Sequence, residues 1–253
     1  MIVKAIKTRK FLPPQDNLEK LLSENIKYLK EKSIVVVTSK VVAIGEGNCM
    51  EVSKTDKDKL IIEESDKYLS RELSPEGLVI QTIKHNMLIA SAGVDESNGD
   101  GYFVLWPKNP QVSAKKIWEF LKEKFNLENF GVLITDSRLT PLRAGVVGYA
   151  IGYFGFKPLK DYRGKSDLFG REFKMETSNI PDSLASAAVL EMGEGAECQP
   201  LAIISDVDYI EFIQEEFKPK TPDDDLNIQF EKDMFYPFLS KVDWKNGGSG
   251  KKG

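Results

Sequence analysis

The chain has 253 residues, of which 41% are hydrophobic and 29% are charged. This composition is typical of a globular protein and excludes a chain that is disordered, collagen-like or coiled-coil throughout. The 35 basic and 39 acidic residues leave a formal net charge of -4, which argues against a broad basic face and against nucleic acid as a partner. Two cysteines are too few for a disulfide framework and fit a reducing compartment.

The sequence contains one histidine, His85. Ser/His/Asp triads, Cys/His pairs and multi-histidine zinc sites need an imidazole at the reacting centre, so this count excludes most of them. We expect any catalysis to use carboxylates, hydroxyls, Lys or Arg, and a hard metal ion. No stretch approaches the roughly 18–20 apolar residues that span a bilayer, and charges interrupt the N-terminal segment, so we expect a cytoplasmic protein without membrane association.

The first half of the chain alternates between helix and strand patterns. Apolar spacing and β-branched runs predict a helix over residues 17–32, a buried strand over 33–38, a helix over 56–71, and a hairpin of strands 78–83 and 87–90 that turns at His85 and Asn86.

The second half continues this irregular alternation. The sequence predicts strands over 101–106, 131–135 and 201–204, and further strands within 145–155. It predicts a helix capped by Ser113, a helix over 181–192 and a short helix over 206–215. A polar linker is expected over 219–225 and a flexible tail over 246–253. Because hairpin signals lie among irregularly spaced helices, an α+β fold is favoured over a regular βαβ array.

Four polar islands interrupt the apolar strands, at residues 38–40 with 45–47, 91–98, 135–143 and 191–197. Carboxylates, hydroxyls and small residues at strand ends are typical of phosphate and Mg²⁺ or Mn²⁺ binding. A structural interpretation stands beside this one, since Asp95 and Asp136 also fit turns in which an Asp bonds its own backbone. The residue pattern alone therefore indicates an α+β protein that could bind a metal ion and an anion.

Taken in order, the islands resemble the coenzyme F420-0:gamma-glutamyl ligase family. The family pattern includes Thr-Ser-Lys-Val-Val, Glu-Gly, Ala-Gly-Val-Asp-x-Ser-Asn, a strand ending in Asp-Thr/Ser, Ala-Ile-Gly, Arg-Gly-x-x-Asp-x-x-Gly-Arg, a Thr and Asp-x-Leu-Ala. The corresponding residues here are 38–42, 46–47, 92–98, 136–137, 150–152, 163–171, 177 and 182–185. Each piece is weak alone, but the ordered set is specific and covers about residues 10 to 205.

The resemblance implies an enzyme that adds L-glutamate through a gamma-linked amide to a carboxylate acceptor. A carboxylate is a poor electrophile, so GTP, or alternatively ATP, would convert it to an acyl phosphate, with Mg²⁺ or Mn²⁺ neutralising phosphate charge and K⁺ as an additional cation. The family implies largely antiparallel sheets with packed helices, and a homodimer of two-domain subunits. We expect residues 1–76 with 183–245 to form a nucleotide-contacting domain, and residues 77–182 an inserted domain that carries the metal and substrate loops.

The resemblance also implies residue roles. Metal ligands are expected to be Asp95, Asp136, Ser137 and Glu194, where Glu194 replaces the family's Gln. Contacts to the nucleotide are expected from Leu12, Pro13, Pro14, Gln15, Ser39, Lys40, Asn98, Met192, Gly193 and Gly195. Catalytic contacts to phosphate or substrate carboxylates are expected from Arg143, Arg163 and Arg171, because a guanidinium binds such groups through two parallel hydrogen bonds.

Besides Glu194, three positions depart from the family pattern. Ile44 stands where the family often has a phosphate-directed Lys, and the turn that usually reads Gly-Arg-Pro-Trp-Arg has Thr140 and Leu142 in place of an Arg and the Trp. These changes leave two alternatives open. The acceptor could be a folate-like molecule instead of the F420 precursor, or the protein could bind nucleotide and metal without ligase activity.

Overall fold

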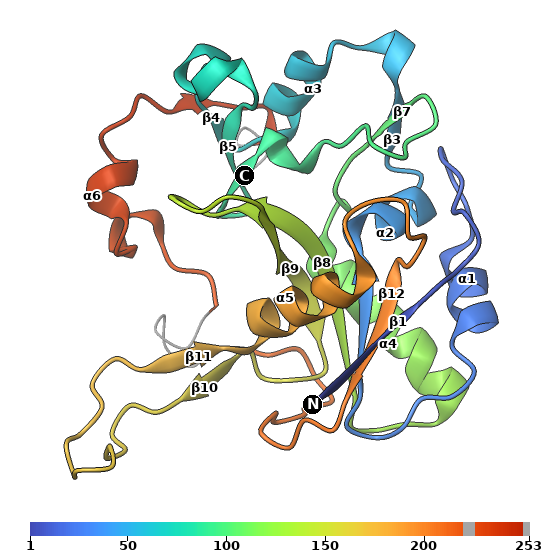
Figure 1. Cartoon of the computed structure of the whole chain (residues 1–253), viewed down its shortest axis with the longest axis vertical. Helices are drawn as coiled ribbons and strands as arrows, with labels where there is room; N and C mark the ends of the chain where they lie inside the picture. The colour runs from blue at the N-terminus through green and yellow to red at the C-terminus, as the bar shows by residue number, and fades with distance from the viewer. Residues whose placement is uncertain (220–225, 250–253) are drawn as a thin grey trace.

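The computed structural model describes residues 1–219 and 226–249. Its centre is a five-stranded mixed sheet with strand order β1-β12-β2-β8-β9 (Figure 1). The strands are β1 (Ile2–Ile6), β2 (Ile34–Thr38), β8 (Gly131–Leu139), β9 (Val146–Phe154) and β12 (Leu201–Ser205). Strands β2 and β8 are parallel, and the other neighbours in this sheet are antiparallel.

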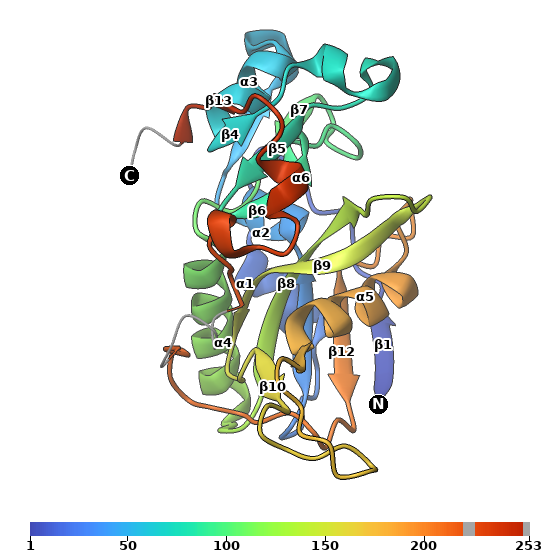
Figure 2. The same ribbon diagram turned by 90° about the vertical axis from the view of Figure 1, so that its left-hand side faces the viewer.

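Helices cover both faces of this sheet (Figure 2). The side chains of Val35 and Val37 pack on one face with α1 (Leu18–Asn25) and α4 (Pro110–Phe125), whereas Ile34 and Val36 pack on the other with α5 (Ile180–Met192). Successive residues of a strand point to opposite faces, and helices cover both faces of this sheet. All four side chains are therefore buried. In the described part of the chain, no helix is both long and apolar enough to cross a membrane.

A smaller layer packs above one edge of the central sheet (Figure 2). It contains the sheet β13-β4-β5-β6, the strand pair β3-β7 and the helix α3, which share a separate core that includes Leu60, Ile61 and Phe103. The elements are α2 (Ser39–Gly45), β3 (Cys49–Glu51), α3 (Lys57–Glu64), β4 (Lys67–Tyr68), β5 (Gln81–Lys84), β6 (Met87–Ala90), β7 (Tyr102–Val104) and β13 (Lys245–Asn246). Short 3-10 helices connect them at Val52–Lys54, Arg71–Leu73, Pro75–Gly77 and Ser91–Gly93.

Two further segments project from the body of the molecule. Strands β10 (Leu159–Asp161) and β11 (Thr177–Asn179) form the base of a long arm that extends away from the sheet (Figure 1). The C-terminal segment carries a 3-10 helix (Phe230–Lys232) and α6 (Tyr236–Leu239), and then returns to the small sheet as β13.

The predicted α+β class with largely antiparallel sheets is confirmed. The division into residues 1–76 with 183–245 and 77–182 stays a prediction. The sheets add one fact about it: β8 and β9, which lie within 77–182, pair in the central sheet beside β2. The hairpin turn at His85 and Asn86 is confirmed, and both residues have the positive φ that a two-residue type I′ turn requires.

Several predicted elements differ in extent. The helices predicted over 17–32 and 56–71 are shorter, ending at Asn25 and Glu64. Helix α4 begins at Pro110 and is capped by Asn109, whose side chain accepts from the Val112 amide, so the predicted cap at Ser113 is wrong. Ser113 is instead buried in the first turn, where its hydroxyl donates to Glu46.

Two predictions for the C-terminal part are wrong. Residues 206–215 are not a helix, because Ile210 and Phe212 alternate toward the second core and the segment bonds the 155–157 backbone in extended form. Residues 246–249 are not a free tail, because Gly247 and Gly248 donate to backbone oxygens at Asp66 and Ile62. Of the predicted linker, residues 220–225 lie outside the described residues, as do residues 250–253 of the predicted tail.

Candidate functional site

A pocket of about 780 Å³ opens where β2 ends beside the parallel strand β8, which continues to Leu139. Thr38 pairs with Thr135 in the register of these strands, so the residues that follow each of them meet at the same edge. Ser39 and Lys40 begin α2 on one side, and Asp136 and Ser137 continue β8 on the other. A shift in the register at Ile134 and Thr135 lies beside the pocket, as bulges near active sites often do. We call this cavity the main pocket.

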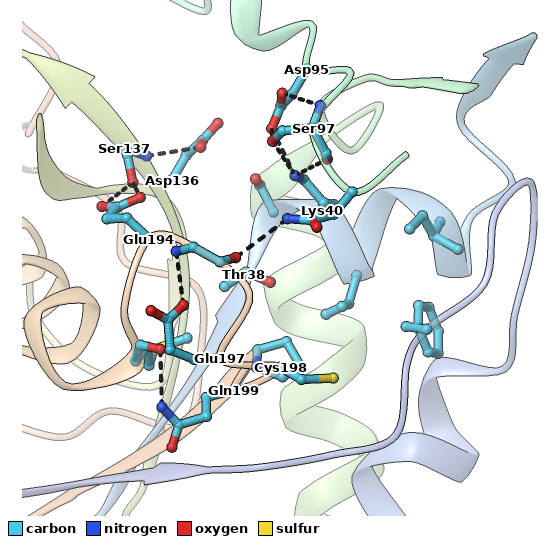
Figure 3. A pocket seen from close by; sticks show the side chains of 18 of the residues that line it. Thr38, Lys40, Asp95, Ser97, Asp136, Ser137, Glu194, Glu197, Cys198 and Gln199 are labelled. Carbon is cyan, nitrogen blue, oxygen red and sulfur yellow. Dashed lines mark hydrogen bonds and ion pairs between the residues drawn. The ribbon is translucent and has the colours of Figure 1, made fainter. Parts of the chain in front are cut away.

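Asp136 is the most perturbed carboxylate in the main pocket. Its Oδ2 accepts a hydrogen bond from Nε1 of Trp106, and its Oδ1 accepts one from the Ser137 amide at 2.8 Å. Burial raises the pKa of Asp136 to about 6; the charge of Asp95 adds to this rise, and the two hydrogen bonds oppose it. The two aspartates, which are distant in sequence, are therefore close enough to interact, and Figure 3 shows both carboxylates directed into the same opening.

Asp95 lies in a different electrostatic environment. The Nζ of Lys40 lies 2.7 Å from its Oδ2, and the amide and hydroxyl of Ser97 each donate to it at 2.8 Å (Figure 3). Burial opposes ionisation of Asp95, but Lys40 and Ser97 outweigh burial and hold its pKa below the usual value. Asp95 is therefore a carboxylate at neutral pH, already paired with a cation.

The loop after α5 forms the third wall of the main pocket. The Ser137 hydroxyl donates to the carboxylate of Glu194 at 2.7 Å, and the side-chain amide of Asn98 donates to the Gly195 carbonyl at 3.3 Å. The Glu197 carboxylate accepts from the Gly195 amide at 2.8 Å (Figure 3). These bonds connect the loop to β8 and to the 91–98 segment, so three distant parts of the chain converge.

The donors of the main pocket suit a hard divalent cation. Asp95, Asp136, Ser137 and Glu194 offer only carboxylate and hydroxyl oxygens, which are the ligands that Mg²⁺ and Mn²⁺ prefer. Among residues 1–219 and 226–249, no three His, Cys, Asp or Glu side chains are already gathered as a metal cluster. The pocket is lined by five acidic and three basic side chains, so an anion such as a polyphosphate would need a bound cation to enter it favourably.

The nucleotide that the sequence predicts should bind about 10-fold or more weakly when Lys40 is replaced with Met, because one of the three cations lining the main pocket is lost and Asp95 loses its partner. Fluorescent-nucleotide titration with Mg²⁺ would measure the change. Lys57→Met is the matched control, since Lys57 pairs with the neighbouring Glu96 at 3.4 Å but does not line the pocket. Equal affinities in the two variants would contradict the role assigned to Lys40.

The main pocket brings together most of the residues singled out in the sequence. Those that line it are Leu12, Pro13, Ser39, Lys40, Asp95, Asn98, Asp136, Ser137, Met192, Gly193, Glu194 and Gly195. Pro14 and Gln15 do not line it; the Gln15 side chain lies against Gly47 instead. Ile44 lines the pocket as a buried apolar side chain, at the position where the family pattern has Lys.

The three arginines expected in catalysis do not line the main pocket. Arg143 lines a second cavity beside it. Arg163 and Arg171 lie on the arm, where Arg163 pairs with Asp161 at 2.8 Å and Arg171 is exposed. The hairpin β10-β11 carries Arg163 and Arg171 away from the central sheet (Figure 1). Their catalytic role stays a prediction.

Sequence reasoning missed several residues of the site. Trp106, which donates a hydrogen bond to Asp136, lies two residues after the end of β7, and no neighbouring pattern distinguishes it from a core aromatic. Lys10 lines the main pocket beside Leu12 and has no ion pair among the residues that the structure describes. A basic pair next to the Leu-Pro-Pro segment was the available signal for Lys10, whereas Glu197 could only be found from the loop geometry.

Comparison with known proteins shows the family of this chain. The family model described as F420-0:Gamma-glutamyl ligase matches residues 6–206, and the chain belongs to this family. Relatives named coenzyme F420:L-glutamate ligase include one from Methanopyrus kandleri, 35% identical over 75% of this chain and 81% of the relative. One from Methanosarcina mazei is 33% identical over 82% of this chain and 88% of the relative. One from Methanococcus maripaludis is 38% identical over 70% of this chain and 76% of the relative.

Proposed function

We propose that this protein is a nucleotide- and divalent-metal-dependent ligase that adds L-glutamate to a carboxylate acceptor. One observation carries the proposal: Asp95 and Asp136 line one pocket where β2 ends beside β8, and the charge of Asp95 contributes to the raised pKa of Asp136. Membership of the F420-0:gamma-glutamyl ligase family supports glutamate as the amine substrate. The F420 precursor is the first acceptor to test, with a folate-like acceptor second.

The proposed ligation has two steps, activation of the acceptor carboxylate and formation of the amide. An oxygen of the acceptor carboxylate attacks the terminal phosphorus of GTP or ATP, the bond from that phosphorus to the bridging oxygen breaks, and the nucleoside diphosphate leaves. The glutamate amine then attacks the carbonyl carbon of the acyl phosphate, the carbon–oxygen bond to phosphate breaks, and phosphate leaves as the amine loses a proton. Neither step needs an imidazole, in agreement with the single histidine.

The residues of the main pocket fit this chemistry. Asp95, Asp136, Ser137 and Glu194 would hold Mg²⁺ or Mn²⁺, which neutralises phosphate charge and polarises the transferred group. Lys40 and Lys10 would contact phosphate oxygens as point charges. The apolar side chains Phe11, Leu12 and Val41 line the same pocket and would contact the nucleoside. An additional K⁺ stays a prediction.

The arm supports the proposal of a homodimer. Leu168 and Phe169 at its end are 97% and 95% exposed, and Arg171 beside them is also exposed. Apolar side chains held on an extended hairpin are typical of a surface that contacts another subunit. In such a dimer Arg163 and Arg171 would serve the site of the second subunit. Sedimentation analysis of Phe169→Ser against the unchanged protein tests this, and equal masses would contradict it.

The function is tested by phosphate release. The purified protein is incubated with GTP or ATP, Mg²⁺ or Mn²⁺, glutamate and each acceptor, and phosphate and glutamylated product are both measured. We expect phosphate release that requires glutamate and acceptor together and matches the product formed. Nucleotide binding without such release would instead support a non-catalytic nucleotide- and metal-binding protein, which the apolar Ile44 in the pocket makes the second candidate.

A further inference from the structure

A second cavity of about 480 Å³, which we call the side cavity, adjoins the main pocket. Ile89 and Ala90 at the end of β6 line both cavities. Most of its lining is apolar, and the polar side chains that reach it are those of Gln81, Thr140 and Arg143. A cavity of this size with a few polar groups is typical of a small-molecule site.

The C-terminal segment closes one side of this cavity with Phe238, Leu239, Val242 and Trp244. The Trp244 indole donates to the Leu239 carbonyl at 2.8 Å, and β13, which follows directly, pairs with β4. Before α6 in the chain, the Ile228 carbonyl accepts a hydrogen bond from the side-chain amide of Asn86 at 2.6 Å. The wall is thus bonded to the body on both sides of α6, and it lies outside residues 6–206, which the family model matches.

Strand β8 sets the distance between the side cavity and the carboxylate of Asp136 in the main pocket. Strand β8 carries Asp136 and Ser137 in the main pocket and continues to Leu139, which lines the side cavity with the adjoining Thr140. Three residues of extended chain span roughly 10 Å. A molecule that reaches from one cavity to the other therefore needs two recognition groups separated by about that length.

We propose that the side cavity binds a planar heteroaromatic ring of the acceptor while the acceptor's carboxylate lies at Asp136. This assignment rests on the proposed ligase function. Trp244 and Phe238 supply aromatic surface for a ring, Leu88 and Leu139 supply apolar contact, and Arg143 supplies a cation for an anionic group of the acceptor. The nucleoside has a separate apolar region at Phe11, Leu12 and Val41, so the side cavity remains for the acceptor.

The same cavity explains where acceptor specificity is determined. Thr140, one of the departures from the family pattern, lines the side cavity, whereas Leu142 in the same turn is exposed and does not line it. A deazaflavin and a pterin share the planar ring chemistry, and they are the two sources to distinguish.

Leu88→Trp tests the assignment by filling the side cavity. The probes are a 5-deazaflavin nucleoside and 6-hydroxymethylpterin, which carry the ring without a carboxylate, and binding is read from ring fluorescence polarisation. We expect one probe to bind, and Leu88→Trp to weaken it at least 10-fold with nucleotide affinity unchanged. Leu78→Trp is the control, because Leu78 is 71% exposed and lines neither cavity, and it should leave both affinities unchanged.

Trp244 provides a second reading that does not depend on Leu88→Trp folding. Ring binding should quench tryptophan emission in the unchanged protein, and Trp244→Phe should remove most of that quenching. Binding of neither ring, or equal ring affinity in Leu88→Trp and the unchanged protein, would overturn the assignment. Ring binding that persists without any glutamate-dependent phosphate release would overturn the ligase function and leave the ring site standing.

Discussion

Asp136→Asn is expected to lower glutamate ligation by about 10²–10³-fold or more while the protein stays folded. The neutral amide removes the charge that would hold a cation at the centre of the main pocket, yet it preserves the size of the side chain that Trp106 contacts. Coupled phosphate release, compared with circular dichroism of the same sample, would measure both effects. Unchanged turnover would remove Asp136 from the proposed metal site.

The same substitution is expected to change how stability depends on pH. The folded pKa of Asp136 is about 6 and its ordinary value is 3.8, so between these values the folded state keeps a proton that the unfolded state has lost. The unchanged protein therefore loses stability as pH rises through this window, and Asp136→Asn does not. Relative to the unchanged protein, the variant should gain about 1–2 kcal/mol between pH 4 and 7, less than the full shift because the side chain is only partly buried.

Chemical denaturation at pH 4 and pH 7 would give this difference. A difference in unfolding free energy that stays constant across the window would show that burial does not disfavour the ionised Asp136. The sign also has a functional meaning, because a carboxylate that destabilises the fold when ionised is a group retained for binding and not for packing.

Gly93→Ala is expected to be the most destabilising single change near the site, at about 3 kcal/mol. Gly93 has a φ of +72°, and an added Cβ would lie 2.0 Å from Nε1 of Trp106. The indole would have to move away, and its hydrogen bond to Asp136 would be lost. Denaturant unfolding would measure the free energy, and ligation should fall together with it.

Gly101→Ala separates the two causes of that loss. Gly101 also has a left-handed φ, of +88°, but an added Cβ there would meet no atom within 4 Å. We expect a cost of about 1 kcal/mol from backbone strain alone, with ligation retained. Equal destabilisation by the two substitutions would contradict the argument that Trp106 fills the space beside Gly93.

The main pocket could be predicted from sequence because its polar residues directly follow buried apolar runs. Asp136 comes directly after the buried run 131–135, and Ser39 follows 33–38, so their meeting at one edge depends only on how β2 and β8 pair. The arm and the side cavity could not be predicted in this way. Their positions depend on pairing between segments far apart in sequence, such as β13 with β4, that leaves no local periodic signal.

Local patterns also failed where the surroundings outweighed them. The apolar residues around Phe212 match the spacing of an amphipathic helix only in part. Backbone hydrogen bonds to residues 155–157 hold this segment in an extended conformation instead. The apparently flexible Gly-rich end was misread for a related reason. Gly248 fits closely over α3, where an added Cβ would lie 2.5 Å from the Glu63 carbonyl oxygen.

The order of strands in the central sheet has a consequence for biosynthesis. Among the described residues β1 is bonded to β12 alone, so β1 stays without its partner strand until nearly two hundred further residues have been made. Strand β2 likewise waits for β8 and β12. Closure of this sheet is therefore a late, non-local event, and nascent chains stalled before residue 201 would present an apolar β2 edge to chaperones.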